Sequence, residues 1–258
     1  MLLLALVPSA VLSLAPLVDP AAAESATAAP AVAEILEKVV AAHGGDAVRE
    51  CPGYRARGRV LSLVDGRSGR LRLSVALDGS FRSEIRYPGR EEIRILAGRL
   101  AWNGGSRRQT LAGAEMSDSM HLQFHRMAAP FELAREDAAA LTLLPESEEG
   151  WIRLERVWNS RTRTVYEIDP ESGRIRRIRG EVTQAGDAAD SAHGKDGALE
   201  FVSEANDFRE VDGILFPFRI TSIVAGDAAA EIILDRVQIE PDFDADEFRP
   251  AGSGGGDI

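Results

Sequence analysis

The chain has 258 residues, of which 45% are hydrophobic and 28% are charged, so it carries enough apolar material for a buried core. These fractions exclude a disordered tail protein, a collagen-like fibre and a protein with many membrane spans. The formal net charge of -11 argues against nucleic acid as a partner, because phosphates require a basic protein face. The single cysteine, Cys51, excludes an internal disulfide framework.

The first segment has the pattern of a secretory signal. Residues 2–18 are almost wholly apolar, and three small residues, Ala21 to Ala23, follow them, as at a signal cleavage site. The first charged residue is Asp19, so a basic region is missing in front of the apolar stretch. We predict a chain organised as a signal peptide over 1–23, a linker over 24–30, a single domain over 31–250 and a flexible tail over 251–258.

Two segments have the pattern of helices. Between Ala31 and His43, apolar residues recur at spacings of three and four, which predicts a helix that Gly44 and Gly45 terminate. Between 118 and 135 the apolar residues show no alternation. We expect one or two short helices there, with Asp118 as N-cap and Pro130 as the point of a kink or break.

Most of the remaining chain alternates apolar and polar residues, which is typical of strands with one buried and one wet face. Short turns such as Asp65-Gly66, Asp78-Gly79 and Pro88-Gly89 separate these runs and favour antiparallel hairpins. Residues 184–197 are rich in Ala, Asp and Gly and are expected to form an exposed loop. The pattern predicts one large antiparallel sheet with two or three helices.

Candidate chemical sites are few. His121 and His125 would share a helix face, as in some zinc sites, but the sequence indicates no third ligand. Asp242, Asp244 and Asp246 begin like a calcium loop, yet the glycine and the final glutamate of such a loop are missing, which favours a solvated acidic turn. No nucleophile motif is present. We therefore predict a non-enzymatic protein without metal, cofactor or catalytic residues.

A sheet of this size needs cover on its apolar face, and the two predicted helices cover only part of it. A curled sheet would form a trough that suits lipids or other apolar ligands. The alternative is an interior that its own side chains fill. Strand parity and the soft Met/Phe segment predict the lining of this trough: Leu73, Val75, Phe81, Ile85, Ile95, Trp102, Met127, Phe131, Phe216 and Phe218.

Three sequence motifs carry a resemblance to a known family. The segment from Asn206 to Pro217, with Asp212-Gly213 at its centre, resembles the "dyr-vdGv-lP" signature of outer-membrane lipoprotein carrier and sorting proteins, the LolA-like superfamily. Residues 166–173 resemble the "y-ldp-tG" hairpin of that family. The opening, from Ile35 through Gly44-Gly45 to Gly58, resembles its "alGG…i…y…G" start.

The resemblance implies a mainly β (α+β) fold, in which a curved antiparallel half-barrel, or unclosed β-barrel, has helices over its open side. It also implies a periplasmic protein that binds and transfers lipid or the acyl chains of lipoproteins without catalysis. The expected partners are a lipid or an acylated lipoprotein and an envelope membrane complex, with the chain itself a monomer. The alternative function is an envelope sensing or interaction domain with a filled cavity. The resemblance assigns no functional residue.

Overall fold

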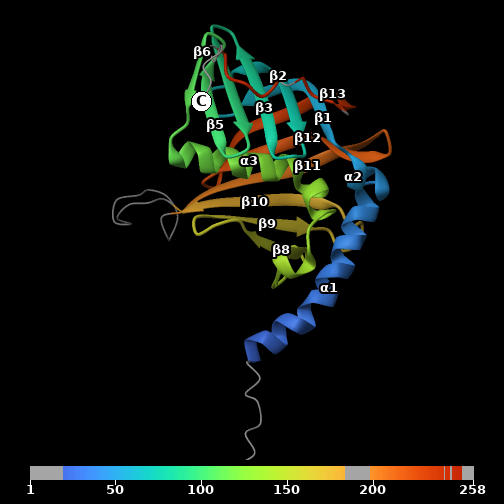
Figure 1. Cartoon of the computed structure of the whole chain (residues 1–258). Helices are drawn as coiled ribbons and strands as arrows, with labels where there is room; N and C mark the ends of the chain where they lie inside the picture. Colours follow the sequence, from blue (N-terminus) through green and yellow to red (C-terminus); the bar gives the residue numbers. More distant parts are fainter. Residues whose placement is uncertain (1–19, 184–197, 241, 245, 252–258) are drawn as a thin grey trace, which may run out of the picture.

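The computed structural model describes residues 20–183, 198–240, 242–244 and 246–251. The apolar part of the predicted signal peptide, the predicted loop 184–197 and the tail from residue 252 lie outside these ranges. Thirteen strands form one sheet in which every neighbouring pair is antiparallel (Figure 1). The strands are β1 (Gly53–Ser62), β2 (Ser68–Ala76), β3 (Ser80–Tyr87), β4 (Arg90–Ala97), β5 (Leu100–Gly105), β6 (Arg108–Leu111), β7 (Thr142–Leu144), β8 (Ile152–Val157), β9 (Thr162–Ile168), β10 (Ile175–Thr183), β11 (Ala198–Val211), β12 (Ile214–Val224) and β13 (Asp227–Ile239).

The strand order defines an open sheet. It runs β6-β5-β4-β3-β2-β1-β13-β12-β11-β10-β9-β8-β7, so the first and last strands of the chain pair in the middle. Tyr54 lies opposite Ile239 in this central pair. Strands β6 and β7 are the two edges, and no ladder joins them. The structure confirms the prediction of a mainly β fold built on an unclosed antiparallel sheet.

The helices differ in extent from the prediction. They are α1 (Pro20–His43), α2 (Asp46–Glu50) and α3 (Ala114–Leu133), with a 3-10 turn at Ala138–Ala140 before β7. Helix α1 starts earlier than predicted and includes residues 24–30, which we expected to be a linker. Helix α2 was not predicted, because five residues after a glycine pair are too few to show periodicity.

Helix α3 is continuous, although two short helices were an alternative. It begins after Gly113, so the prediction of Asp118 as N-cap is wrong; the Asp118 carboxylate pairs instead with Arg161 at 2.7 Å. Pro130 lies inside the helix and does not end it. Proline in a helix removes one backbone hydrogen bond. We attribute the continuity to packing, because the two apolar residues that follow, Phe131 and Leu133, are fully buried.

The three sequence motifs meet at the end of α1. The His43 Nε2 atom accepts a hydrogen bond from the Ile175 N–H at 3.2 Å. Gly44 lies against the β11–β12 turn so closely that a Cβ on it would be 2.2 Å from the Gly213 carbonyl oxygen. A Cβ on Gly173, in the turn before β10, would likewise be 2.9 Å from the Lys38 carbonyl oxygen. These motifs therefore attach α1 to two turns of the sheet.

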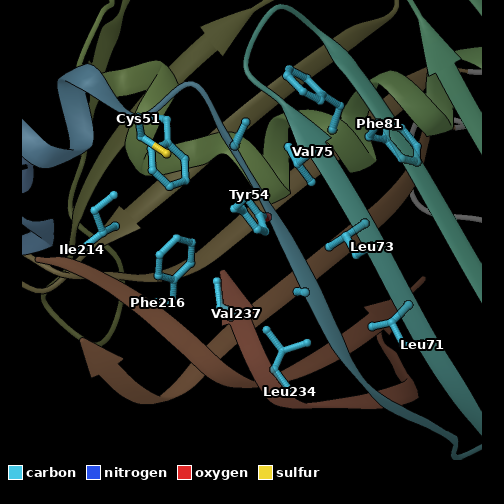
Figure 2. Close-up of a cluster of buried hydrophobic side chains, with 14 of the residues drawn as sticks. Cys51, Tyr54, Leu71, Leu73, Val75, Phe81, Ile214, Phe216, Leu234 and Val237 are labelled. Atoms are coloured by element: carbon cyan, nitrogen blue, oxygen red, sulfur yellow. The ribbon is translucent and has the colours of Figure 1, made fainter. Parts of the chain in front are cut away.

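Two clusters of buried side chains form the core. The larger one joins β1, β2, β3, β12 and β13 to α3, and Figure 2 shows Tyr54, Val75 and Phe216 converging in it from different strands. The smaller one joins α1 and the end of α3 to β8, β9 and β10, with Tyr166 and Leu154 fully buried in it. Both clusters lie on the face of the sheet that the helices cover, which is called the inner face below.

The chain after β13 covers part of the outer face. The backbone oxygens of Glu247 and Arg249 accept hydrogen bonds from Arg82 Nη1 at 3.4 and 3.3 Å, and Ser74 Oγ donates to the Glu247 carboxylate at 2.5 Å. The Ala251 N–H donates to the side chain of Gln109. We call the described residues in this stretch, 240, 242–244 and 246–251, the C-terminal strap. It crosses β2 and β3 and reaches β6 (Figure 1).

Candidate functional site

Most of the predicted lining lies on the inner face of the sheet. Register pairs Val75 with Phe81, which lies opposite Leu96 in β4, so these side chains share one face of the pleat. Eight of the ten predicted residues belong to the core cluster under α3 or pack against its edge: Leu73, Val75, Phe81, Ile85, Met127, Phe131, Phe216 and Phe218.

Two predicted residues face the opposite way. Ile95 and Trp102 lie opposite each other, and Ile95 also lies opposite Arg82, whereas Phe81 pairs with Leu96. The prediction that both residues lie on the inner face is therefore wrong. Alternation alone could not show which of Ile95 and Leu96 faces inward, because they are adjacent apolar residues and both are fully buried. The C-terminal strap covers the outer face at this point, which explains why an apolar residue occupies it.

The centre of the predicted site is packed with side chains. The ring of Phe131 lies 5.9 Å from the Tyr54 ring and 5.8 Å from the Phe216 ring, measured between centroids. Tyr54 Oη donates a hydrogen bond to the Met127 carbonyl oxygen at 3.2 Å, which fixes α3 to β1. Phe131 and Phe81 expose 1% and 0% of their surface. These residues form a core in the structure.

A second part of the inner face is less completely covered. Phe201 of β11, Ile220 of β12 and Ile232 of β13 are only half-buried, although register places them on the inner face with Val60 and Gly180. None of the three was predicted as part of the site. Only Ile220 lies between two polar residues, a pattern that many other strand positions share, whereas Phe201 and Ile232 each have an apolar neighbour, Val202 and Ile233.

One face of α3 is half-buried in the same way. Gln123, Arg126, Met127 and Pro130 follow a spacing that places them along one side of a helix, and all four keep part of their surface exposed. The neighbouring side of the helix carries Phe124 and other core residues. The half-buried side chains of α3 and of β11–β13 together are the candidate site, which we call the inner channel face.

The charge at this face is positive. Arg94 of β4 donates from Nη1 to Gln123 Oε1 at 3.0 Å. Arg126 Nη1 is sealed from solvent and has no hydrogen-bond partner among the described residues. The Arg126 guanidinium carbon lies 5.4 Å from the centre of the Phe201 ring. Burial, with the positive charge of Arg94 as a second cause, lowers the pKa of Arg126 to about 10, so it remains a cation at neutral pH.

The histidine pair occupies the other side of α3. His125 Nδ1 lies 2.9 Å from a carboxylate oxygen of Glu132, and its ring stacks on Trp158 with centroids 3.5 Å apart. His121 is half-buried, and burial lowers its pKa. Within the described ranges, no three His, Cys, Asp or Glu side chains gather closely enough to hold a metal ion.

The other chemically distinctive residues have structural surroundings. Cys51 is buried, its thiol donates to the Gly53 carbonyl oxygen at 3.6 Å, and burial raises the pKa of the thiol. Such a thiol is a weak nucleophile at neutral pH. Asp242, Asp244 and Asp246 are exposed on the C-terminal strap, and Asp246 pairs with Arg249 at 2.7 Å.

Comparison with known proteins defines the fold. The sequence matches no protein-family model and no curated protein. Among solved structures, a domain assigned as an outer membrane lipoprotein-sorting protein from Vibrio parahaemolyticus is similar, with a TM-score of 0.53 at 12% identity over 84% of this chain and 97% of that one. A LolA superfamily protein from Nitrosomonas europaea has a TM-score of 0.50 at 14% identity, over 84% and 96% of the two chains. The chain therefore has a LolA-like fold, as its motifs predicted.

None of the described helices combines the length and the apolar composition that crossing a bilayer requires.

Proposed function

We propose that the protein is an exported, periplasmic carrier that binds a lipophilic ligand on the inner channel face and passes it to an envelope partner. The observation that carries this proposal is the half-buried apolar surface between α3 and strands β11–β13, where Phe201, Ile220 and Ile232 keep part of their surface exposed. Apolar surface of this kind gains about 25 cal/mol per Å² when a ligand covers it. The LolA-like fold and the signal-like start of the sequence support the same proposal.

The ligand is a lipid or the acyl chain of a lipoprotein, and the chain acts as a monomer without catalysis. Met127 is part of the candidate site, and flexible methionine side chains adapt to ligands of different shape. An acyl chain contributes about 0.8 kcal/mol for each methylene that it buries, so a partly covered apolar surface is sufficient for micromolar affinity.

A sensing or interaction domain is the second candidate function. The packed region around Phe131, Tyr54 and Phe216 favours it, because these rings leave no exposed surface for a ligand to cover at the centre of the site first predicted from the sequence. A domain of this kind would use the fold as a scaffold and would carry no lipid after purification.

The experiment that separates the two functions is lipid analysis of the protein purified from its own compartment, by native mass spectrometry and extraction. A carrier should retain lipid and should also bind 1-aminoanthracene, an uncharged fluorescent probe. Substituting Ile232→Gln on the inner channel face should weaken probe binding about tenfold and change the melting temperature little.

The matched control is Leu111→Gln, at a position that is 64% exposed and lies opposite Trp102, on the outer face. This control should bind the probe like the parent protein. Absence of extracted lipid together with absence of probe binding would overturn the carrier proposal and leave the sensing domain.

A further inference from the structure

The inner channel face contains two guanidinium groups without a carboxylate partner. Arg94 is held by the neutral side chain of Gln123, and Arg126 has no hydrogen-bond or ion-pair partner among the described residues. The two cations are close enough for the charge of Arg94 to disfavour the charged form of Arg126. A pair of like charges in a partly apolar environment is costly unless an anion neutralises it.

On the outer face of the same sheet, one group of arginines shares a buried carboxylate. There, the buried carboxylate of Glu167 accepts hydrogen bonds from Arg177 at 3.1 Å and from Arg179 at 2.9 Å. Arg153 completes the group, with its Nε atom 3.8 Å from Glu167. The fold therefore supplies an internal carboxylate to this group of outer-face arginines, and the described residues supply none to Arg94 and Arg126.

The chain makes room for Arg126 at the sheet. Gly180 of β10 lies below its guanidinium, and a Cβ at this position would be 3.2 Å from Arg126 Nη1. Glycine inside a strand often marks the close approach of another group. The Phe201 ring on the neighbouring strand stabilises the cation from one face. Gly180 and Phe201 thus define the position of the guanidinium. Part of the side chain remains accessible, because Arg126 is only half-buried.

Apolar surface continues from the two arginines along the sheet. Register connects Ile220 of β12 to Ile232 of β13, and Ile232 to Val60 of β1, on the same inner face. Ile85 of β3 is the next half-buried apolar residue toward Arg94. A long apolar chain can therefore lie across β11, β12 and β13 while its polar end meets the two cations.

We infer that Arg126 and Arg94 bind the anionic head group, a carboxylate or a phosphate, of a long-chain lipid whose chain covers the inner channel face. This inference rests on the proposed carrier function and specifies the ligand as an anionic amphiphile. Guanidinium groups suit this role because their N–H donors match carboxylate and phosphate oxygens, and charge-assisted hydrogen bonds are about twice as strong as neutral ones.

The test compares oleate with oleyl alcohol, which has the same chain without the charge, as competitors of 1-aminoanthracene on the full-length protein. The parent protein should bind oleate about tenfold more tightly than oleyl alcohol. Substituting Arg126→Gln should remove this preference by weakening oleate alone. The matched control, Arg57→Gln, changes an exposed arginine on the outer face and should keep the preference.

The possible results separate this inference from the carrier proposal. Binding of neither oleate nor oleyl alcohol to the parent protein would overturn both. Equal binding of the two compounds, or a preference for oleate that survives Arg126→Gln, would leave the carrier and overturn the assignment of the head group to Arg126. Oleyl phosphate and inorganic phosphate distinguish the source of the anion, because the inference requires binding of the amphiphile and much weaker binding of the free ion.

Thermal stability gives a readout that does not depend on a ligand. An arginine held for an external anion destabilises the free protein, so Arg126→Gln should melt at the same or a higher temperature than the parent. Oleate should raise the melting temperature of the parent more than that of the variant. A large drop in the melting temperature of ligand-free Arg126→Gln would show that the guanidinium has a structural partner in this chain, and would overturn the inference.

Discussion

His43 links the end of α1 to two strands through its neutral imidazole. Its Nε2 atom accepts from the Ile175 N–H at 3.2 Å, and its Nδ1 atom lies 3.4 Å from the Leu215 carbonyl oxygen, to which the N–H tautomer donates. Burial lowers the pKa of His43 from 6.5 to about 4. Protonation would remove the acceptor for Ile175 and place a charge inside the protein.

The pKa of His43 is lower in the folded than in the unfolded chain, so its contribution is complete above pH 6.5 and is lost as the pH falls toward 4. We expect the free energy of unfolding to decrease by about 3 kcal/mol over this range through His43 alone. The variant His43→Gln should lack this pH-dependent contribution to the free energy of unfolding. Urea unfolding of parent and variant at pH 7 and pH 4 measures the contribution. A stability difference between parent and variant that does not change with pH would contradict the assignment.

Gly44 and Gly45 provide a matched pair of substitutions. Both have positive φ, at 129° and 61°. A Cβ on Gly44 would be 2.2 Å from the Gly213 carbonyl oxygen, whereas a Cβ on Gly45 would meet no atom within 4 Å. Gly44→Ala should therefore cost about 3 kcal/mol or more, and Gly45→Ala about 1 kcal/mol. Equal losses in chemical denaturation would show that Gly44 does not depend on its contact with the β11–β12 turn.

At the scale of secondary structure, the sequence predicted strands better than their inward faces. Ile85 was placed correctly because the polar residues Glu84 and Arg86 flank it. Ile95 and Trp102 were misplaced because the outer face there is buried too, under a C-terminal strap that has no periodic pattern of its own. The alternation of apolar and polar residues shows which face is buried only when the other face is exposed to solvent.

The strap itself can be removed selectively. Its Phe243 packs on Gly53, where a Cβ would be 2.6 Å from the phenylalanine ring, and Arg55 lies 4.9 Å above the same ring. A chain ending at Ile239 should lose about 2 kcal/mol or more, because Ile95 would become exposed, and should bind the dye 1-anilinonaphthalene-8-sulfonate more strongly. A chain ending at Ala251 keeps the strap and should behave like the parent. Unchanged stability of the shorter chain would show that the strap does not protect Ile95.

At the scale of the molecule, the large antiparallel sheet was predictable because each hairpin is encoded locally by alternation and a short turn. The extent to which side chains fill the inner face was not predictable. It depends on side chains that meet from distant parts of the chain, such as Phe131 with Tyr54 and Phe216. The positive charge of the site was missed for a related reason, since Arg94 and Arg126 come together only when α3 packs against β4 on one side of the sheet and against β10 on the other.

The central pairing of β1 with β13 sets the order in which contacts can form during folding. Every other ladder joins strands that are neighbours in the sequence, so the wings β1–β6 and β7–β13 can each grow through local hairpins. Tyr54 and Ile239 meet only when nearly the whole folded chain has been closed into a loop, and the entropy of that closure makes such contacts slow. We therefore expect the two wings to act as separate folding units, which α3 links covalently until β1 and β13 pair.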